Sequence, residues 1–117
     1  MMWLLVGDPA KLHDVLRNLI ENAANYAPER TTIGLSAHRE GDHVALVVED
    51  EGPGIPEADR QRVFERFYRV DKARSRETGG TGLGLSIVKH LVGLHGGDVR
   101  AENRPTGGAR FTVRIPA

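Results

Sequence analysis

The amino-acid sequence predicts a two-layer α/β sandwich, in which helices cover one face of a sheet. Two long segments place apolar residues at helical spacing, and four shorter segments carry the apolar patterns of strands. Along the chain they follow the order helix, two strands, a long irregular segment, helix, two strands. The 117 residues suffice for one domain with one core and are too few for a second folded domain.

The first helix is predicted over residues 9 to about 27. Asp8 can cap its first turn, and Pro9 stands where its missing N–H has no cost. Apolar residues at the spacing of one buried face then follow until Pro28 ends the pattern. This face consists of Leu12, Val15, Leu16, Leu19, Ile20, Ala23 and Ala24.

Two neighbouring antiparallel strands are predicted next. In the first, Ile33, Leu35 and Ala37 alternate with polar or small residues. A Gly-Asp pair at 41–42 separates it from the second strand, which contains the apolar run VALVV. Such a run is typical of a strand buried on both faces, so the second strand should be central in its sheet. Residues 57–64 are long enough for a turn or two of helix.

Residues 65–82 show little usable periodicity, and loops of this length are usually functional lids or disordered segments. Helical spacing returns at Gly82 and ends at the sequence HGG, residues 95–97. Two closing strands are predicted over 98–103 and 109–116, and residues 3–6 are a candidate for a short edge strand. The predicted core face of the second helix consists of Leu83, Ile87, Leu91 and Leu94, widened by Val88 and Val92.

Composition and charge exclude several classes of protein. With 39% hydrophobic and 27% charged residues, the chain is typical of soluble domains, and its first apolar stretch is too short to span a membrane. Sixteen basic residues balance sixteen acidic ones, which argues against nucleic-acid binding, although residues 60–76 hold seven Lys or Arg and only two acids. The lack of cysteine excludes disulfides and zinc–thiolate sites, and the five histidines lack metal-ligand spacing.

Three asparagines form a polar stripe along the border of the apolar face of the first helix. Asn18, Asn22 and Asn25 lie within roughly 60° of one another around the helix axis. An amide carbonyl can coordinate Mg²⁺, and an amide N–H can donate to phosphate. A solvated helix face with incidental asparagines would show the same pattern, so the stripe alone does not establish a binding site.

An acidic residue and two glycines end the predicted central strand. Asp50 is followed by Gly52 and Gly54, and glycine permits positive φ and close approach of the backbone to a ligand. A carboxylate at this place can accept a hydrogen bond from the exocyclic amine of adenine. An ordinary acidic turn is the alternative.

The stretch GGTGLG at 79–84 opens the second helix. A Rossmann fingerprint needs a strand before the glycines, and KARSRET at 72–78 cannot be a buried strand. A Walker loop needs a Gly-Lys-Ser/Thr sequence, which is missing, and a linker would not continue as an amphipathic helix. The remaining interpretation is phosphate binding by backbone N–H groups at a helix N-terminus.

Four motifs in this order resemble the N, G1, F and G2 boxes of the catalytic and ATP-binding domain of sensor histidine kinases. They are NLIENAANYAP (18–28), DEGPGIP (50–56), VFERFYR (63–69) and GGTGLGL (79–85). The resemblance covers nearly the whole chain. It implies the fold of the gyrase, Hsp90 and MutL ATPase domains: a mixed, mostly antiparallel sheet of about five strands with three helices on one face. ATP would lie between two helices and a mobile lid at about 57–81.

The resemblance also implies roles for the first helix. Asn22 would complete the Mg²⁺ site, Asn18 would support the phosphates, and Tyr26 would pack along the nucleotide. Asn25 departs from the family, which often has a basic residue at this position. Lys72 or Arg74 in the lid would then supply the missing phosphate contact.

By the same resemblance, Asp50 would accept the adenine amino group and Ile55 would form a wall of the base pocket. Gly52 and Gly54 would let the backbone approach the base. In the lid, Phe64 and Phe67 would be anchors, Tyr68 would contact the nucleotide and Arg69 would reach the γ-phosphate during transfer. The backbone of the G2 box would wrap the phosphates; its residues are Gly80, Thr81, Gly82, Leu83 and Gly84.

The predicted reaction is phosphotransfer and not efficient hydrolysis. Gyrase-type ATPases activate water with a glutamate where this chain has Asn18, which has no useful basicity. Glu21 is adjacent to Asn22 but about 100° away around the helix, so it points elsewhere. No histidine lies in an H-E-x-[KR]-[ST]-P-like motif, so the acceptor must be on another domain.

The sequence therefore predicts the ATP-binding half of an autokinase, a monomer by itself and a fragment of a longer chain. The resemblance implies transfer to a histidine on the dimerisation domain of that chain, then to a response regulator, with the domain in the cytoplasm and without direct membrane contact. Two alternatives remain: a stand-alone anti-sigma-type serine kinase, and an ATP-binding module without transferase activity.

Overall fold

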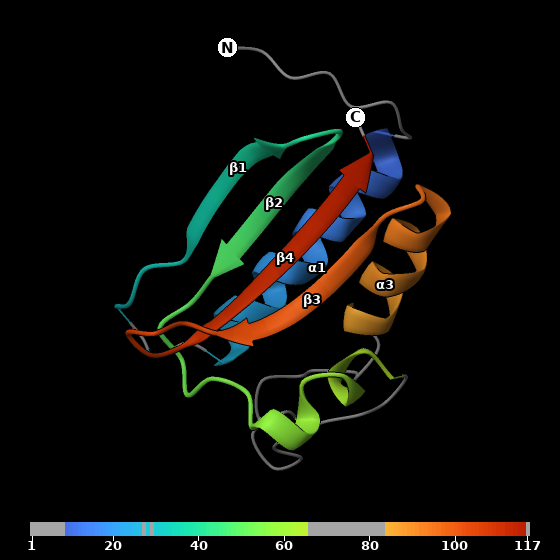
Figure 1. The fold of residues 1–117 in the computed structure, drawn as a ribbon. Helices are drawn as coiled ribbons and strands as arrows, with labels where there is room; N and C mark the ends of the chain where they lie inside the picture. The colour runs from blue at the N-terminus through green and yellow to red at the C-terminus, as the bar shows by residue number, and fades with distance from the viewer. Residues whose placement is uncertain (1–8, 27, 29, 66–83, 117) are drawn as a thin grey trace.

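The computed structural model describes residues 9–26, 28, 30–65 and 84–116, and it has the two-layer α/β architecture that the sequence predicts (Figure 1). Both helices lie on the same side of one sheet. The elements are α1 (Pro9–Tyr26), β1 (Gly34–Glu40), β2 (His43–Glu49), the 3₁₀ turns η1 (Glu57–Asp59) and η2 (Arg62–Phe64), α3 (Gly84–Leu94), β3 (Asp98–Asn103) and β4 (Ala109–Pro116).

The sheet has the strand order β1-β2-β4-β3, and every neighbouring pair is antiparallel. The described part of the sheet is therefore wholly antiparallel, which agrees with the expectation of a mostly antiparallel sheet. The model describes four strands and not five, since the candidate edge strand at 3–6 lies outside the described residues. As predicted, β2 is an inner strand.

Residues 57–64, predicted to form a turn or two of helix, form the two 3₁₀ turns η1 and η2. Eight residues are too few for a cooperative α-helix, and short segments commonly form 3₁₀ turns instead. Phe64 nevertheless fixes this segment to the sheet, because its ring packs edge-to-face on Phe111 of β4 at a centroid distance of 6.2 Å.

The helix α1 ends within a residue of the prediction and buries the centre of its predicted face. Val15, Leu19 and Ala23 are fully buried. Ala24, which was expected on this face, is exposed, because the buried stripe is narrower than the apolar pattern.

The predicted core face of α3 is confirmed for Val88, Val92 and the partly buried Leu91, and it is wrong for Ile87 and Leu94. Val88 and Val92 are fully buried, whereas Ile87 and Leu94 are 41% and 58% exposed. Apolar residues occupy more than half of this helix, so periodicity could not identify which stripe would meet the sheet and α1. The contact with the rest of the core selects the two valines.

The strand β1 is an edge strand whose seven residues are all exposed. Leu35 has the parity of the core-facing residues of the neighbouring strand but is 58% exposed. In Figure 1, α1 lies behind β2 and β4, while β1 is at the far edge of the sheet. The predicted strand is thus confirmed, but its apolar face is not covered.

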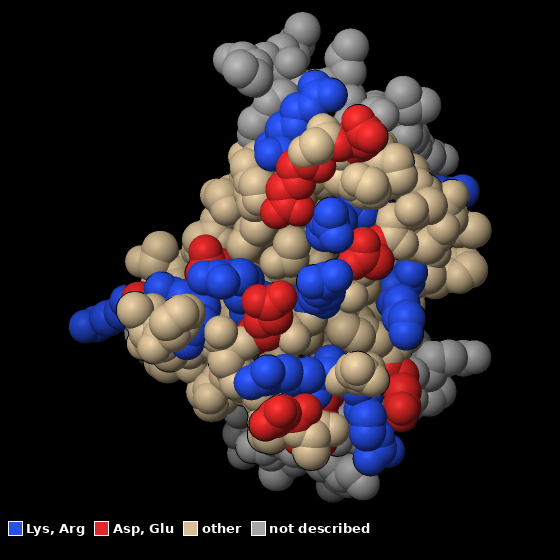
Figure 2. Space-filling view, viewed as in Figure 1, with Lys and Arg blue, Asp and Glu red and all other residues tan. Residues whose placement is uncertain are grey.

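The sheet face opposite the helices is covered by long charged side chains. Figure 2 shows basic and acidic residues interleaved across it. At one end, Glu40 accepts from His38 (2.8 Å) and pairs with Arg114 (3.0 Å). The hydrogen bond with His38 is the main cause that holds the pKa of Glu40 below its ordinary value, with a smaller contribution from Arg114. This face is therefore a network of ion pairs and not an apolar surface.

Candidate functional site

Asp50 follows the last residue of β2 and is the only buried charged side chain among the described residues, with 3% of its surface exposed. Its Oδ1 accepts hydrogen bonds from the backbone N–H of Gly52 (2.8 Å) and of Ala109 (3.2 Å). No described residue donates to Oδ2. Buried polar groups normally have hydrogen-bond partners, so this second oxygen is the part of Asp50 available to a ligand.

The backbone of Asp50 is held by the turn between β3 and β4. Its N–H donates to the Ala109 carbonyl (3.0 Å), and its carbonyl accepts from Arg104 Nη1 (3.0 Å). Arg104 Nε and Arg110 Nε in turn lie 3.2 and 3.3 Å from the same oxygen of Glu49. Two arginines and one glutamate thus fix the end of β2.

Gly108 completes this arrangement, because it adopts φ +94° and packs directly on the Asp50 peptide. A Cβ at Gly108 would overlap the Asp50 carbonyl oxygen and lie 2.8 Å from the carbonyl carbon. Sequence reasoning missed Arg104 and Gly108. The glycine pair at 107–108 could have indicated a turn, but nothing local indicates that this turn packs on Asp50.

Gly54 and Ile55 lie in the loop after Asp50, as predicted, and a side chain that the prediction missed holds them. Gly54 adopts φ +80°. The Ile55 N–H donates to Asn103 Oδ1 (2.7 Å), and Asn103 Nδ2 donates to the Ile55 carbonyl (2.8 Å). The Ile55 side chain is buried in the core cluster.

The asparagine stripe of α1 lies at the border of the core, as expected, with Asn18, Asn22 and Asn25 all half-buried. Asn18 Nδ2 donates to the Asp14 carbonyl (2.8 Å). Asn18 Oδ1 faces the first residue of α3, since a Cβ added at Gly84 would lie 3.3 Å from it. The N and G2 motifs, which are 66 positions apart at these residues, are therefore in contact.

Asn22 and Asn25 make no side-chain hydrogen bond with any described residue, so their amides are available to a ligand. Glu21 is 65% exposed at its side chain and lies 4.0 Å from Arg17. As predicted from the helix geometry, Glu21 is on the solvent side and away from the stripe.

These elements meet at one end of the sheet. In Figure 1 the C-terminal end of α1, the end of β2, the N-terminal end of α3 and the two 3₁₀ turns lie toward the same end of the molecule. The first-turn N–H groups of α3 have no intrahelical partner, and the positive end of the helix dipole favours an anion. Asp50 supplies a buried acceptor, the asparagines supply neutral amides and α3 supplies N–H donors.

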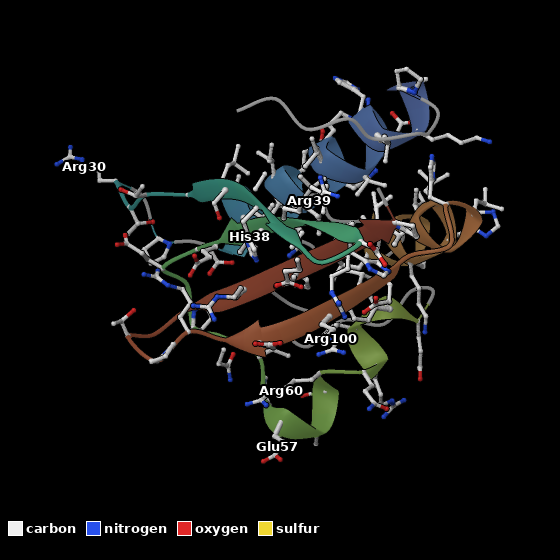
Figure 3. The ribbon with its side chains drawn as sticks, turned by 45° about the horizontal axis from the view of Figure 1, so that its top comes forward. Arg30, His38, Arg39, Glu57, Arg60 and Arg100 are labelled. Atoms are coloured by element: carbon white, nitrogen blue, oxygen red, sulfur yellow. The ribbon has the colours of Figure 1, made fainter. Side chains whose placement is uncertain are left out.

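Described basic side chains lie both at the 3₁₀ turns and on the opposite face of the sheet. Figure 3 shows Arg60 and Glu57 at the turns, whereas His38 and Arg100 come from strands and line a groove on the opposite face of the sheet. In the described part of segment 60–76, Arg62 pairs with Glu65 at 3.7 Å. The charged groove lies on the sheet face opposite the helices and reaches Glu49, the residue before Asp50.

Nine predicted site residues are not placed by the structure. The side chain of Tyr26, together with Phe67, Tyr68, Arg69, Lys72, Gly80, Thr81, Gly82 and Leu83, lies outside the described residues. Where the chain is described, no three histidine or acidic side chains form a group that could hold a metal ion. None of its described helices is long and apolar enough to cross a membrane.

The sequence matches the family model described as histidine kinase-, DNA gyrase B-, and HSP90-like ATPase over residues 7–117. It is 47% identical over 112 residues to the sensor-like histidine kinase SenX3 of Mycolicibacterium smegmatis, covering 96% of this chain and 29% of that protein. The chain thus spans less than a third of the length of this curated relative.

Solved structures of histidine kinases have the same fold. The mycobacterial sensor histidine kinase MprB superposes with a TM-score of 0.85 at 34% identity, covering 97% of this chain and 75% of that one. Full-length ShkA in complex with AMPPNP superposes with a TM-score of 0.81 at 32% identity, covering 96% of this chain and 22% of that one. The two-layer fold derived above is therefore the fold of histidine kinase ATP-binding domains.

Proposed function

Because the chain belongs to the family of histidine kinase-, DNA gyrase B- and HSP90-like ATPases, we propose that it binds Mg-ATP and transfers the γ-phosphate to a histidine of another domain. The observation that carries this proposal is the buried carboxylate of Asp50. One oxygen is fixed by two backbone N–H groups, and the other has no donor among the described residues. Such an acceptor matches the exocyclic amine of adenine.

The base would lie against the loop that follows Asp50. Gly52 and Gly54 give the base access to the backbone, and Ile55 forms one wall. The nucleotide complex of the structural relative ShkA supports a nucleotide as the ligand.

The phosphates and the metal would lie between α1 and the start of α3. Asn22 fits Mg²⁺, because this ion commonly takes one or two protein oxygens and completes its shell with phosphate oxygens and water, and Asn18 would support the phosphates. The contact between Asn18 and Gly84 brings these amides to a helix N-terminus, which suits phosphate. The bound Mg²⁺ would neutralise phosphate charge during transfer.

The G2 and lid residues complete the proposal. The backbone from Gly80 to Gly84 would wrap the phosphates; this segment includes Thr81, Gly82 and Leu83. Arg69 would stabilise charge on the γ-phosphate, Lys72 would replace the basic contact that Asn25 lacks, and the aromatic side chains Tyr26, Phe67 and Tyr68 would pack beside the nucleotide.

Transfer is favoured over hydrolysis because no described residue of the asparagine stripe supplies a base for water. Asn18 stands where gyrase-type ATPases have a glutamate, and the nearby Glu21 is on the solvent side. The acceptor histidine would come from the dimerisation domain of a longer chain. That domain would dock on this one in the cytoplasm and later pass the phosphate to a response regulator. The exposed Ile87 and Leu94 on α3 are a candidate surface for that docking.

The test has two parts. Calorimetry of a non-hydrolysable ATP analogue, with and without Mg²⁺, measures binding to the chain and to Asn22→Ala and Asp50→Ala. We expect Asp50→Ala to weaken binding under both conditions and Asn22→Ala to weaken it mainly with Mg²⁺. Glu21→Ala, next to Asn22 but on the solvent side, is the matched control. Unchanged affinity in both test variants would overturn the site assignment.

The second part identifies the acceptor. The chain is incubated with γ-labelled ATP and a separately prepared dimerisation domain of a sensor kinase, or with an anti-anti-sigma protein. Label on histidine supports the proposal, whereas label on serine supports a serine kinase. Analogue binding without label on either protein identifies a binding module.

A further inference from the structure

The loop that follows Asp50 is held in place by a side chain from another strand. Between Gly52 and Ile55, the backbone makes few hydrogen bonds to described residues. The Gly52 N–H donates to Asp50 Oδ1, and both polar groups of the Ile55 backbone bond to Asn103. Among the described residues, Asn103 is therefore the group outside the loop that hydrogen-bonds to its backbone between Gly52 and Ile55.

The side chain of Asn103 pairs with Ile55 as a second peptide group would. Its carbonyl accepts at 2.7 Å and its amide donates at 2.8 Å, so both the position and the tilt of the Ile55 peptide are defined. Space is also limited, since a Cβ at Gly54 would lie 2.8 Å from Asn103 Oδ1. Gly54 therefore packs closely against this side chain.

The same strand pair determines where Asp50 lies. Asn103 is the register partner of Ala109, whose carbonyl accepts from the Asp50 N–H and whose own N–H donates to Asp50 Oδ1. The positions of Ile55 and of the Asp50 carboxylate are thus both fixed by one residue pair between β3 and β4, Asn103 and Ala109. The distance between the proposed wall of the base pocket and the proposed acceptor depends on Asn103.

We propose that Asn103 is a positioning residue for nucleobase selection: it holds the Gly54–Ile55 backbone at a fixed place relative to the Asp50 carboxylate without contacting the nucleotide. This inference rests on the proposed function, since it assumes that Asp50 accepts the amine of adenine. Loss of Asn103 would let Ile55 move away from the base. The preference for adenine over other bases would then fall, whereas the contacts with the phosphates would change less.

The test compares ATP with inosine triphosphate, whose base has a carbonyl in place of the exocyclic amine and so offers Asp50 no donor at that position. The measured quantity is the ratio of the two dissociation constants, obtained by calorimetry with Mg²⁺. In Asn103→Ala we expect the preference for ATP to fall about tenfold, as for the loss of one to two hydrogen bonds. Asn103→Ser, which can replace only one of the two bonds, should fall between the alanine variant and the original chain.

Controls separate positioning from general damage. Glu102→Ala changes the neighbouring residue of β3, which makes no hydrogen bond to the loop, and should leave the ratio unchanged. Thermal unfolding of each variant establishes that it is folded. If Asn103→Ala does not fold, Asn103→Ser replaces it in the comparison of the two nucleotides. In a reconstituted transfer assay, Asn103→Ala should raise KM for ATP and leave kcat unchanged at saturating ATP.

The outcomes distinguish this inference from the proposed function. If Asp50→Ala abolishes the preference for ATP and Asn103→Ala reduces it, both are supported. If Asp50→Ala abolishes the preference but Asn103→Ala leaves the ratio unchanged, or weakens both nucleotides equally, the positioning role is refuted and the site assignment stands. If Asp50→Ala leaves the preference intact, the site assignment itself is wrong.

Discussion

Gly108 offers a direct test of how the turn between β3 and β4 fixes Asp50. Replacing it by alanine introduces two separate costs. The first is conformational, because φ is +94° and residues with a side chain are strained there by about 1–3 kcal/mol. The second is a collision with the Asp50 peptide, whose carbonyl carbon would lie 2.8 Å from the new Cβ.

The collision cannot be relieved by rotating a side chain, because the atoms involved belong to the backbone. Asp50 must shift, and its carbonyl then loses the hydrogen bond from Arg104 while Oδ1 loses that from Ala109. A typical hydrogen bond contributes about 0.5–1.5 kcal/mol, so the second cost is about 1–3 kcal/mol. The two costs together predict a loss of about 2–6 kcal/mol of unfolding free energy.

Gly107 supplies the matched control. Its φ is +103°, but a Cβ added there has no atom within 4 Å, so Gly107→Ala carries only the conformational cost. Urea denaturation measures both variants, and calorimetry with an ATP analogue measures binding. We expect Gly108→Ala to be about 1–3 kcal/mol less stable than Gly107→Ala and to bind the analogue more weakly. Equal stability and equal affinity of the two variants would refute the reasoning.

Three further predictions concern the helices and the open face of the sheet. Val88→Ala should cost about 2 kcal/mol of unfolding free energy, and Ile87→Ala should change it by less than about 0.5 kcal/mol, because only Val88 is fully buried; equal losses in urea denaturation would contradict the observed face of α3. Gly84→Ala should leave stability within about 1 kcal/mol yet weaken ATP-analogue binding, since its Cβ would press on the asparagine stripe; calorimetry that finds full affinity would disprove this. The hydrogen bond with His38 lowers the pKa of Glu40, so the stabilisation that Glu40 provides is present above its unfolded pKa and is lost as the pH falls through its folded pKa. The difference in urea midpoint between the chain and Glu40→Gln should therefore shrink between pH 6 and about pH 3, which lies below the usual glutamate pKa. A difference that stays constant with pH would exclude this linkage.

Much of the fold is encoded locally, which is why it could be predicted. Pro9 is the first residue of α1 and Pro28 follows its end, and α1 ends within one residue of the prediction. The run VALVV is apolar on both faces, which identified β2 as an inner strand. In the same way, Asp50 and Gly54 stand out because a carboxylate and glycines directly follow a buried strand.

The missed features depend on contacts between distant parts of the chain. Asn103 and Gly108 act on residues 48 and 58 positions away, and no pattern within either segment indicates its target. The stripe of α3 that packs on the core was also decided by its neighbours, since Ile87 and Val88 are equally apolar. Leu35 alternates as a buried residue would, but α1 does not extend beneath the edge strand that carries it.

The hydrogen bond from the Asp50 N–H to the Ala109 carbonyl extends the ladder between β2 and β4 by one rung. The end of the site that carries Asp50 is therefore the last rung of the two central strands and is continuous with them. We expect the Asp50 amide to exchange its hydrogen with solvent more slowly than the amides of the loop that follows it. A ligand bound to the native state raises the free energy of global opening, so occupancy of the carboxylate would slow exchange at amides throughout these strands.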